Sequence, residues 1–171
     1  MSIIYSTMED LDAIFKLYEA GTQHQKTVSD KHWAGFEQSL VEQEIREHRQ
    51  WKIMEGDQIA CIFVITFNDP FIWKEKDKDP AIYLHRITTN PLFRGNGYVT
   101  KIVAWAKAYS DKHGIRFIRM DTGSGNEKLN NYYVSCGFDY LGVTGVADNA
   151  DLPTHYRGGT SSLFEIQIHR S

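Results

Sequence analysis

Hydrophobic residues recur along this chain with two different spacings, and the spacing predicts the type of each element. Intervals of three to four residues predict amphipathic helices, whereas short apolar runs predict strands. Helices are expected over residues 11–20, from about 30 to 48, 99–113 and 126–136. Strands are expected over residues 2–6, 51–54, 59–67, 81–89, 116–122, 138–143 and 163–169.

Local signals predict where the first two helices begin and end. Ser6 and Glu9 have the spacing of a capping box, and Gly21 suits the end of the first helix. The second helix is expected to begin near Ser29 or Asp30. Its apolar side is marked by Trp33, Phe36, Leu40, Val41, Ile45 and His48.

The order of the elements predicts a mixed sheet with helices packed on it, an α/β or α+β fold. The 171 residues fit a single domain over residues 1–171, and the hydrophobic share of 42% is ordinary for a globular protein. Residues 68–80 contain two prolines and a charge run that sums to zero, so they predict a solvated loop.

Charge and cysteine content exclude several classes of protein. The net charge of −3 argues against a nucleic-acid binder, and Cys61 and Cys136 predict free thiols. The N-terminus has no signal-peptide pattern, and no apolar run reaches the ~18 residues of a membrane span. The histidines lack the spacing of zinc ligands. We therefore expect a cytoplasmic protein with no membrane or nucleic-acid partner and no metal.

Two glycines, Gly95 and Gly97, follow Arg94 in a turn that joins a strand to a helix. The first turn of a helix attracts anions through its unpaired N–H groups, and glycine lets the backbone approach them closely. Residues 95–99 can therefore hold a phosphate, with Arg94 and Thr100 as further donors. The Walker spacing and the third glycine of a dinucleotide fingerprint are both missing. Taken alone, a tight turn without a ligand explains the two glycines equally well.

The stretch ITTNPLFRGNGYV resembles the strand end and acyl-CoA loop of the GNAT N-acetyltransferase superfamily, with Pro91, Phe93 and Arg94 in matching positions. A second stretch is similar to the family's next motif at Asn126, Leu129, Tyr132, Tyr133, Gly137 and Phe138. The resemblance covers residues 81–138. Val99 replaces the last glycine of the family's loop, which still leaves a backbone N–H. The resemblance implies a GNAT-like mixed, mostly antiparallel sheet flanked by about four helices.

The same resemblance implies that acetyl-CoA binds as a co-substrate. Its pantetheine arm would pair with the backbone of one strand, its pyrophosphate would lie in the glycine turn, and a short helix would contact the arm. The implied binding residues are Ile87, Thr88, Thr89, Arg94, Gly95, Asn96, Gly97, Tyr98, Val99, Thr100, Asn126 and Asn130. Asn126 also suits the N-cap of that helix, and Asn130 also suits a solvated amide.

The implied reaction moves an acetyl group to a primary amine by direct attack through a tetrahedral intermediate. Tyr133 would protonate the leaving thiolate, and a backbone N–H of Thr88 or Thr89 would face the oxyanion. His85 is a candidate base, although a histidine bonded to backbone explains it as well. Asp121 is a second candidate, and its alternative role is to cap the turn that follows its strand.

The amine acceptor is expected to bind among the N-terminal helices, residues 68–80 and the C-terminal strands. These carry Tyr18, Trp33, Phe36, Phe67, Phe71, Trp73 and Tyr156, of which Trp33 and Phe36 suit the core. The residues do not distinguish a small-molecule amine from a peptide amine, and a homodimer stays open. A non-catalytic acyl-CoA-binding or sensing module on the same fold is the alternative from a different class. A third reading is another kind of phosphate-binding protein.

Overall fold

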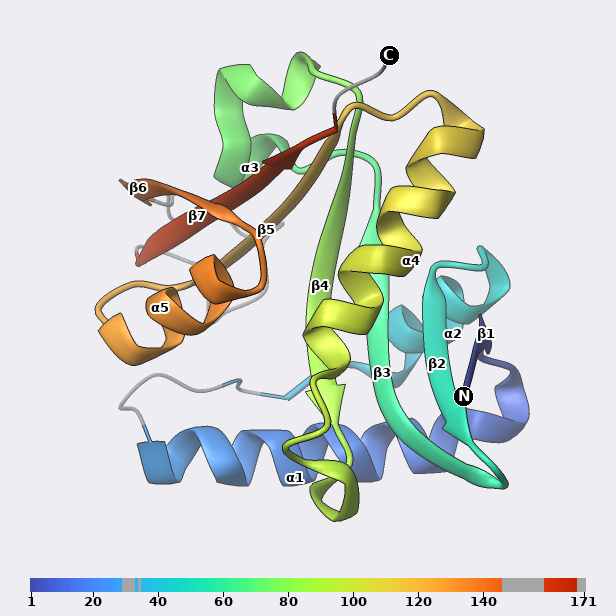
Figure 1. Cartoon of the computed structure of the whole chain (residues 1–171). Helices are drawn as coiled ribbons and strands as arrows, with labels where there is room; N and C mark the ends of the chain where they lie inside the picture. Colours follow the sequence, from blue (N-terminus) through green and yellow to red (C-terminus); the bar gives the residue numbers. More distant parts are fainter. Residues whose placement is uncertain (29–32, 34, 146–158, 169–171) are drawn as a thin grey trace. The chain divides into compact units, whose positions relative to one another are not determined.

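A computed structural model describes residues 1–28, 33, 35–145 and 159–168 (Figure 1). The chain divides into two compact units. Unit 1 comprises Met1–Ile65 and His85–Tyr98, and unit 2 comprises Thr66–Leu84 and Val99–Ser171. Strand β4 (Ala81–Thr89) contributes to both units, and helix α4 (Tyr98–His113) begins at the last residue of unit 1.

The described residues of unit 1 form two helices and three strands besides the second half of β4. The elements are β1 (Ser2–Tyr5), α1 (Leu11–Val28), α2 (Gln38–Arg46), β2 (Gln50–Glu55) and β3 (Gln58–Thr66). The strand order is β1-β2-β3-β4, and β2 pairs antiparallel with both β1 and β3. The strands expected over residues 51–54 and 59–67 are confirmed, and they form an antiparallel hairpin. Its tight turn contains Gly56 at φ +61, a conformation that glycine adopts without steric cost.

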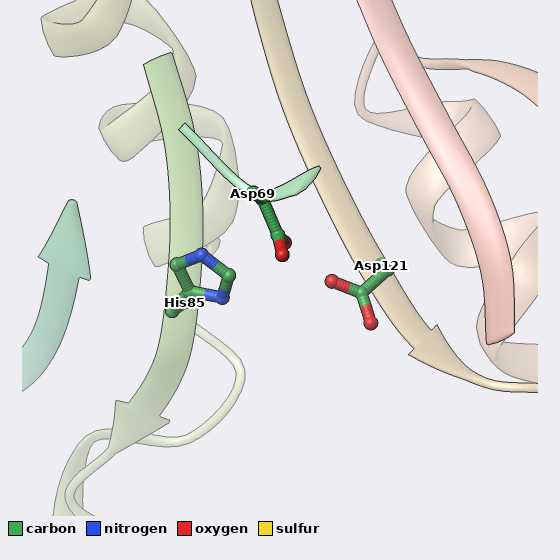
Figure 2. Close-up of side chains that lie close together, drawn as sticks. All are labelled: Asp69, His85 and Asp121. Atoms are coloured by element: carbon green, nitrogen blue, oxygen red, sulfur yellow. The ribbon is translucent and has the colours of Figure 1, made fainter. Parts of the chain in front are cut away.

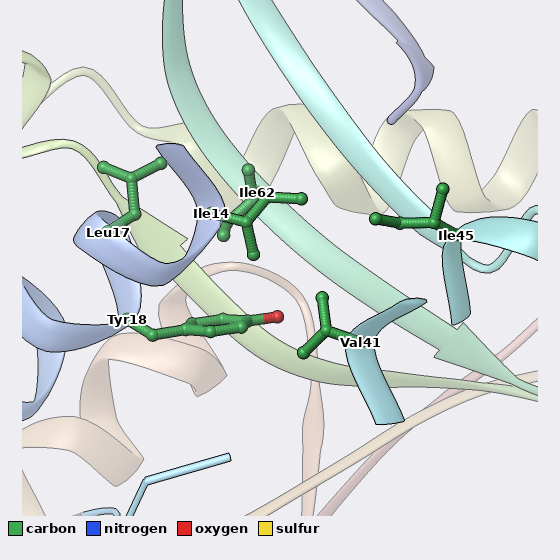
Figure 3. Close-up of a cluster of buried hydrophobic side chains, with 6 residues drawn as sticks. All are labelled: Ile14, Leu17, Tyr18, Val41, Ile45 and Ile62. Carbon is green, nitrogen blue, oxygen red and sulfur yellow. The ribbon is translucent and has the colours of Figure 1, made fainter. Parts of the chain in front are cut away.

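The core of unit 1 forms where α1 and α2 meet β3, as Figure 3 shows. Ile14 of α1, Val41 of α2 and Ile62 of β3 are each fully buried. Burying an aliphatic side chain of this size stabilises a fold by about 1.5–3 kcal/mol. The apolar periodicity of the first helix therefore marks the side of α1 that faces the sheet.

The capping box precedes α1 as expected, but it lies one residue later than predicted. The backbone N–H of Thr7 donates to Asp10 Oδ2 at 2.7 Å, so Ser6 and Glu9 do not form it. Ser6 is buried, and its N–H donates to the carbonyl oxygen of Gln50 at 2.9 Å. Pairing with β2 thus occupies Ser6 and leaves the cap to Thr7.

The predicted end of the first helix at Gly21 is also wrong, because α1 continues to Val28. A Cβ on Gly21 would lie only 3.1 Å from Cγ2 of Thr88. The glycine therefore serves a close contact between α1 and β4 instead of a helix stop. The predicted start of the second helix at Ser29 or Asp30 lies outside the described residues, and α2 itself begins at Gln38.

Unit 2 contributes the other half of the strand order, β4-β5-β7-β6. Its elements are α3 (Pro70–Trp73), β5 (Phe117–Gly123), α5 (Glu127–Ser135), β6 (Asp139–Gly145) and β7 (Thr160–Gln167). β4 and β5 pair in parallel over Ala81–Tyr83 and Phe117–Arg119, whereas β7 pairs antiparallel with β5 and β6. The predicted fold class, a mixed and mostly antiparallel sheet with flanking helices, is confirmed.

The prediction of a solvated loop over residues 68–80 is wrong. This segment forms α3 and a 3-10 helix over Lys74–Lys78. Ile72 and Trp73 are each only 2% exposed, and they pack with Ala81, Tyr83 and Leu163. The apolar FIW triplet inside a charged segment is the signal that predicts this burial.

Arg119 of β5 fixes this segment to the sheet of unit 2. Its side chain is 1% exposed and donates to Glu165 Oε2 at 2.8 Å and to Asp79 Oδ2 at 2.7 Å. Its guanidinium carbon also lies 4.8 Å from the ring centroid of Trp73. Removing one partner of a buried ion pair costs about 3–5 kcal/mol, so we infer that this network is structural.

Helix α4 confirms the helix expected over residues 99–113. Val99, Ile102, Val103 and Ala106 are buried, as its periodicity predicts. Within the described part of the chain, none of the helices has the combination of length and hydropathy that crossing a membrane requires.

Candidate active site

The second half of β4 carries the predicted strand residues in unit 1, and each has a local role. Thr88 is 3% exposed and packs against Gly21, while the Thr89 hydroxyl donates to the sulfur of Cys61 at 3.7 Å. Ile87 is half-buried. Arg86 has a positive φ of 50, which is uncommon for a residue other than glycine. Such strained positions cluster at functional sites, so we regard this part of β4 as a site candidate.

Arg86 is held in place by one residue of α1, one of α2 and one between the two helices. It forms an ion pair with Glu44, and its guanidinium carbon lies 4.6 Å from the ring centroid of Phe36 and 5.3 Å from that of Tyr18. Ion pairing and cation–π contacts together fix the side chain. This arrangement stabilises the irregular backbone that the positive φ creates.

The glycine turn is exposed and lies at the beginning of a 16-residue helix, α4. Gly95 and Gly97 both have positive φ, +87 and +68, and among the described residues no atom outside the two chain neighbours lies within 4 Å of a Cβ built on either. Asn96 Nδ2 donates to the carbonyl oxygen of Phe93 at 2.7 Å, which closes the turn. Arg94 is exposed. The backbone conformation that the two glycines permit, followed by the positive end of a helix dipole, fits an anionic group.

The side chains of Tyr98, Val99 and Thr100, the other residues of the predicted loop, make contacts within their own units. In unit 1, the Tyr98 hydroxyl donates to Glu55 Oε1 at 3.2 Å and its ring is buried. In unit 2, Val99 joins the apolar side of α4, and the exposed Thr100 donates to the sulfur of Cys136 at 3.8 Å. The side chains of Tyr98 and Val99 are therefore buried, and of these three residues only Thr100 has an exposed side chain.

Helix α5 and its N-cap bring together three of the predicted residues of unit 2, Asn126, Asn130 and Tyr133. Asn126 is its N-cap and accepts from the N–H of Leu129 at 3.0 Å. Asn130 is half-buried, and its side-chain oxygen has no hydrogen-bond partner among the described residues. The ring of Tyr133 lies 5.3 Å from that of Phe164 on β7. Tyr132 of the same helix is 42% exposed.

His85 lies on β4 at the start of the second segment of unit 1. Burial lowers the pKa of its imidazole to about 4, and the charges of Arg86 and Arg49 lower it further. The ring is therefore neutral at pH 7. A base with this pKa holds a proton about 10³-fold less well than one with a pKa near 7, because each pKa unit is a factor of ten.

Two carboxyl groups of unit 2, from Asp69 and Asp121, lie beside each other, as Figure 2 shows. A carboxylate oxygen of one lies within 4.8 Å of one of the other. Burial raises the pKa of Asp121 to about 7, against a small opposing effect of the Ser161 hydroxyl. Burial, followed by the charges of Asp121 and Asp77, raises the pKa of Asp69 to about 8.

The alternative role of Asp121, capping the turn after β5, is not observed within the described residues. Both of its oxygens are shielded from solvent, and neither accepts a hydrogen bond of ordinary geometry there. Asp69 was not predicted as a site residue at all. It precedes α3, 52 positions before Asp121 in the chain, and only the fold shows that the two are neighbours.

A pocket of about 420 Å³ lies in unit 1 along α1. Four aromatic rings form its apolar part, and Glu19 and Lys26 bring one charge of each sign. The lining residues are Phe15, Tyr18, Glu19, Thr22, Gln23, Lys26, Trp33, Gly35 and Phe36. Trp33 and Phe36, expected in the core, are only half-buried.

Comparison with known proteins identifies the family of this chain and agrees with its fold. The model of the acetyltransferase (GNAT) family matches residues 10–138, and the chain therefore belongs to that family. An uncharacterised N-acetyltransferase, YesJ of Bacillus subtilis, is 28% identical over 80 residues. That match spans 44% of this chain and only 42% of YesJ.

Solved structures of low sequence identity share the fold. A GNAT-family acetyltransferase from Listeria monocytogenes superposes with a TM-score of 0.77 at 23% identity, covering 98% of this chain and 94% of that one. The yncA protein of Salmonella typhimurium, solved with its cofactor acetyl-CoA, has a TM-score of 0.69 at 12% identity, covering 100% and 95%. At these identities the likeness shows the fold alone.

Proposed function

We propose that this chain is an acetyl-CoA-dependent N-acetyltransferase that moves an acetyl group to a primary amine by direct attack through a tetrahedral intermediate. The observation that carries the proposal is the exposed turn at the beginning of α4, where Gly95 and Gly97 adopt positive φ. Membership of the GNAT family supports the pyrophosphate of an acyl-CoA as the anion that such a turn would hold.

The residues present fit this co-substrate. The turn offers backbone N–H groups and Arg94 to the pyrophosphate, and Ile87–Thr89 would pair with the pantetheine arm. The buried side-chain oxygen of Asn130, which has no hydrogen-bond partner in the described part of the chain, suits an N–H of that arm. Asn126 already serves as an N-cap, so we expect only its amide nitrogen to contact the ligand.

The proposed chemistry needs a proton donor for the leaving thiolate and donors for the oxyanion. Tyr133 would supply the proton, since its phenol stays protonated at neutral pH. Its ring packs against both Phe138 and Phe164, at centroid distances of 6.3 and 5.3 Å. A backbone N–H of Thr88 or Thr89 would face the oxyanion.

The pocket along α1 supports an amine acceptor with an apolar body. Phe15, Tyr18, Trp33 and Phe36 offer ring surfaces, and the carboxylate of Glu19 suits a cationic group on the acceptor. An arylalkylamine or a peptide with an aromatic side chain fits this lining better than a polyhydroxylated aminoglycoside.

A thiol-release assay with acetyl-CoA tests the function directly. The panel should contain an arylalkylamine, an aromatic peptide N-terminus, a lysine peptide, a polyamine and an aminoglycoside. Turnover with at least one amine supports an enzyme, and a preference for the first two supports the pocket. Tight CoA binding without turnover on any amine would instead favour the alternative, a non-catalytic acyl-CoA-binding module.

A further inference from the structure

Strand β5 presents two chemically different faces just beyond the point where its ladder with β4 ends. That ladder ends at Tyr83 and Arg119, whereas β5 continues to Gly123 in register with β7. Neighbouring residues of a strand point to opposite faces of the sheet. Met120 and Asp121, the next two residues of β5, therefore lie on opposite faces.

The partners across β7 identify what covers each face. Met120 pairs with Phe164, whose ring packs on Tyr133 of α5. Asp121 pairs with Leu163, which packs in the cluster with Ile72 of α3. Within unit 2, the tyrosine proposed as the acid thus lies on the α5 side, and Asp121 lies on the α3 side together with Asp69.

Within the described part of unit 2, the charged side chains near the two carboxyls are another carboxylate and an arginine that other acids bind. Asp77, on the 3-10 helix after α3, accepts from the N–H of Asp69 at 2.6 Å and from the Tyr83 hydroxyl at 2.8 Å. Arg119, the cation on this face of β5, is bound by Asp79 and Glu165. On the β7 side, Ser161 offers a hydroxyl to Asp121 but no charge. Two buried carboxylates this close cannot both be ionised without a large cost.

A second observation indicates that this pair faces a ligand. Both oxygens of Asp121 are shielded from solvent, and neither accepts a hydrogen bond of ordinary geometry from the described residues. Buried carboxylates in folded proteins are nearly always satisfied, so an unsatisfied one requires an explanation. An amine or ammonium group from a substrate would supply the missing donors.

We propose that Asp69 and Asp121 share one proton at rest, and that their ionised member takes the proton which the acceptor ammonium loses before it attacks. This inference rests on the proposed acetyltransferase function and adds the identity of its base. The acid and the base would then act from opposite faces of β5.

The proton balance of the step is complete. An N–H bond of the ammonium breaks, the proton passes to the ionised carboxylate, and the pair becomes fully protonated. The free amine forms a C–N bond with the thioester carbon, and the C–S bond breaks with its electron pair on sulfur. Tyr133 protonates that sulfur and recovers a proton from the amide nitrogen, and the carboxyl pair later releases its extra proton to solvent.

The pKa values support the pair over His85. Burial raises the pKa of Asp121 to about 7, and burial together with the charges of Asp121 and Asp77 raises the pKa of Asp69 to about 8, which suits a base that works near neutral pH. The pKa of His85, lowered to about 4 by burial, makes its imidazole a much weaker proton acceptor. For a coupled pair the two apparent pKa values belong to the pair and not to one residue.

The kinetic test uses Asp121→Asn and Asp69→Asn, which keep side-chain shape and remove the base. We expect kcat/KM at pH 7 to fall by about 10²–10⁴-fold and the acidic limb of its pH profile to disappear, with acetyl-CoA affinity unchanged. The control is Asp139→Asn, an exposed carboxyl on β6 of the same unit. Variants with the wild-type acidic limb would overturn the proposal, even if their turnover were lower, because a structural role lowers turnover without moving the limb.

Carboxyl NMR on protein labelled with [¹³C]aspartate tests the shared proton without any turnover. We expect two coupled titrations, at least one with an apparent pKa above 6, and both absent from the double variant. Titration of both carboxyls below pH 5 would overturn the shared proton. The wild type could also show the apparent pKa above 6 and yet acetylate no amine. In that case the proposed acetyltransferase function fails, and the role of the pair as a base fails because there is no reaction for it to serve.

Discussion

Replacing Asp121 with asparagine should make the protein more stable, and increasingly so as the pH rises. The substitution removes a carboxyl whose ionised form is disfavoured by burial, while its amide keeps nearly the same shape. Near pH 4 the wild-type carboxyl is protonated in the folded state, so the two proteins should have similar free energies of unfolding.

The size of the effect follows from the shift in pKa between the unfolded and folded states. The folded pKa of Asp121 is raised from 3.8 to about 7. A raised folded pKa means that the stability contribution is complete below the unfolded pKa and is lost as the pH rises through the folded one. About 3 pKa units at 1.36 kcal/mol each set an upper limit of about 4 kcal/mol for the gain.

A gain smaller than this limit is expected, because water and side chains relax around the charge in the wild type. We expect about 2 kcal/mol above pH 8, which corresponds to a rise in Tm of roughly 4–8 °C for a chain of this size. Asp121 also raises the pKa of Asp69, so its removal relieves part of the second carboxyl's cost.

Urea unfolding at pH 5, 7 and 9, followed by tryptophan fluorescence, measures the difference in free energy of unfolding. The exposed Asp139→Asn serves as the matched control and should show no dependence of this difference on pH. A difference for Asp121→Asn that stays constant from pH 5 to 9, or that decreases, would refute the reasoning. It would mean that the carboxyl is ionised without cost and that the pair does not hold a proton.

Three further substitutions test other parts of the site. Gly97→Val should weaken CoA binding measured by calorimetry at least tenfold, whereas Gly56→Val, which imposes the same backbone strain in the β2–β3 turn, should leave CoA affinity unchanged. Tyr133→Phe should lower kcat by about 10²–10⁴-fold with little change in acetyl-CoA affinity. The control, Tyr132→Phe at an exposed position of the same helix, should leave kcat unchanged. Equal kcat in the two variants would remove Tyr133 from the mechanism. His85→Asn should leave the acidic limb of the pH profile near neutral pH unmoved, since the pKa of its imidazole is about 4; loss of that limb would make His85 the base.

The sequence predicted the elements well and their boundaries less well, for identifiable physical reasons. Both Ser6 with Glu9 and Thr7 with Asp10 have capping-box spacing, and only the pairing of Ser6 with β2 decides between them. Glycine is typical of helix ends, yet the packing of Gly21 against β4 outweighs the low intrinsic helix propensity of this residue. Tertiary contacts of this kind leave no local trace in the sequence.

In the candidate site, too, residues whose roles depend on local backbone conformation could be predicted, whereas residues brought together by tertiary contacts could not. Residues 94–100 and Asn126 could be predicted because a local backbone conformation, a turn or an N-cap, determines their roles. The carboxyl pair could not, since Asp69 and Asp121 become neighbours only when α3 folds onto the sheet of unit 2. Asp69 follows the buried run of β3 and precedes the apolar FIW triplet, so its burial, though not its partner, was open to prediction.

The division of β5 into two faces has a consequence for proton transfer within unit 2. An acid and a base that shared one face could exchange a proton directly, without involving the substrate. Here Met120 and Asp121 are consecutive in β5, so the packing on Phe164 and the packing on Leu163 lie on opposite sides of one layer of backbone. Tyr133 belongs to the first side, and the carboxyl pair belongs to the second. The proton that the carboxyl pair would take from the ammonium is therefore separate from the proton that Tyr133 would give to the sulfur, and Tyr133 would recover its own proton from the nitrogen of the reacting amine.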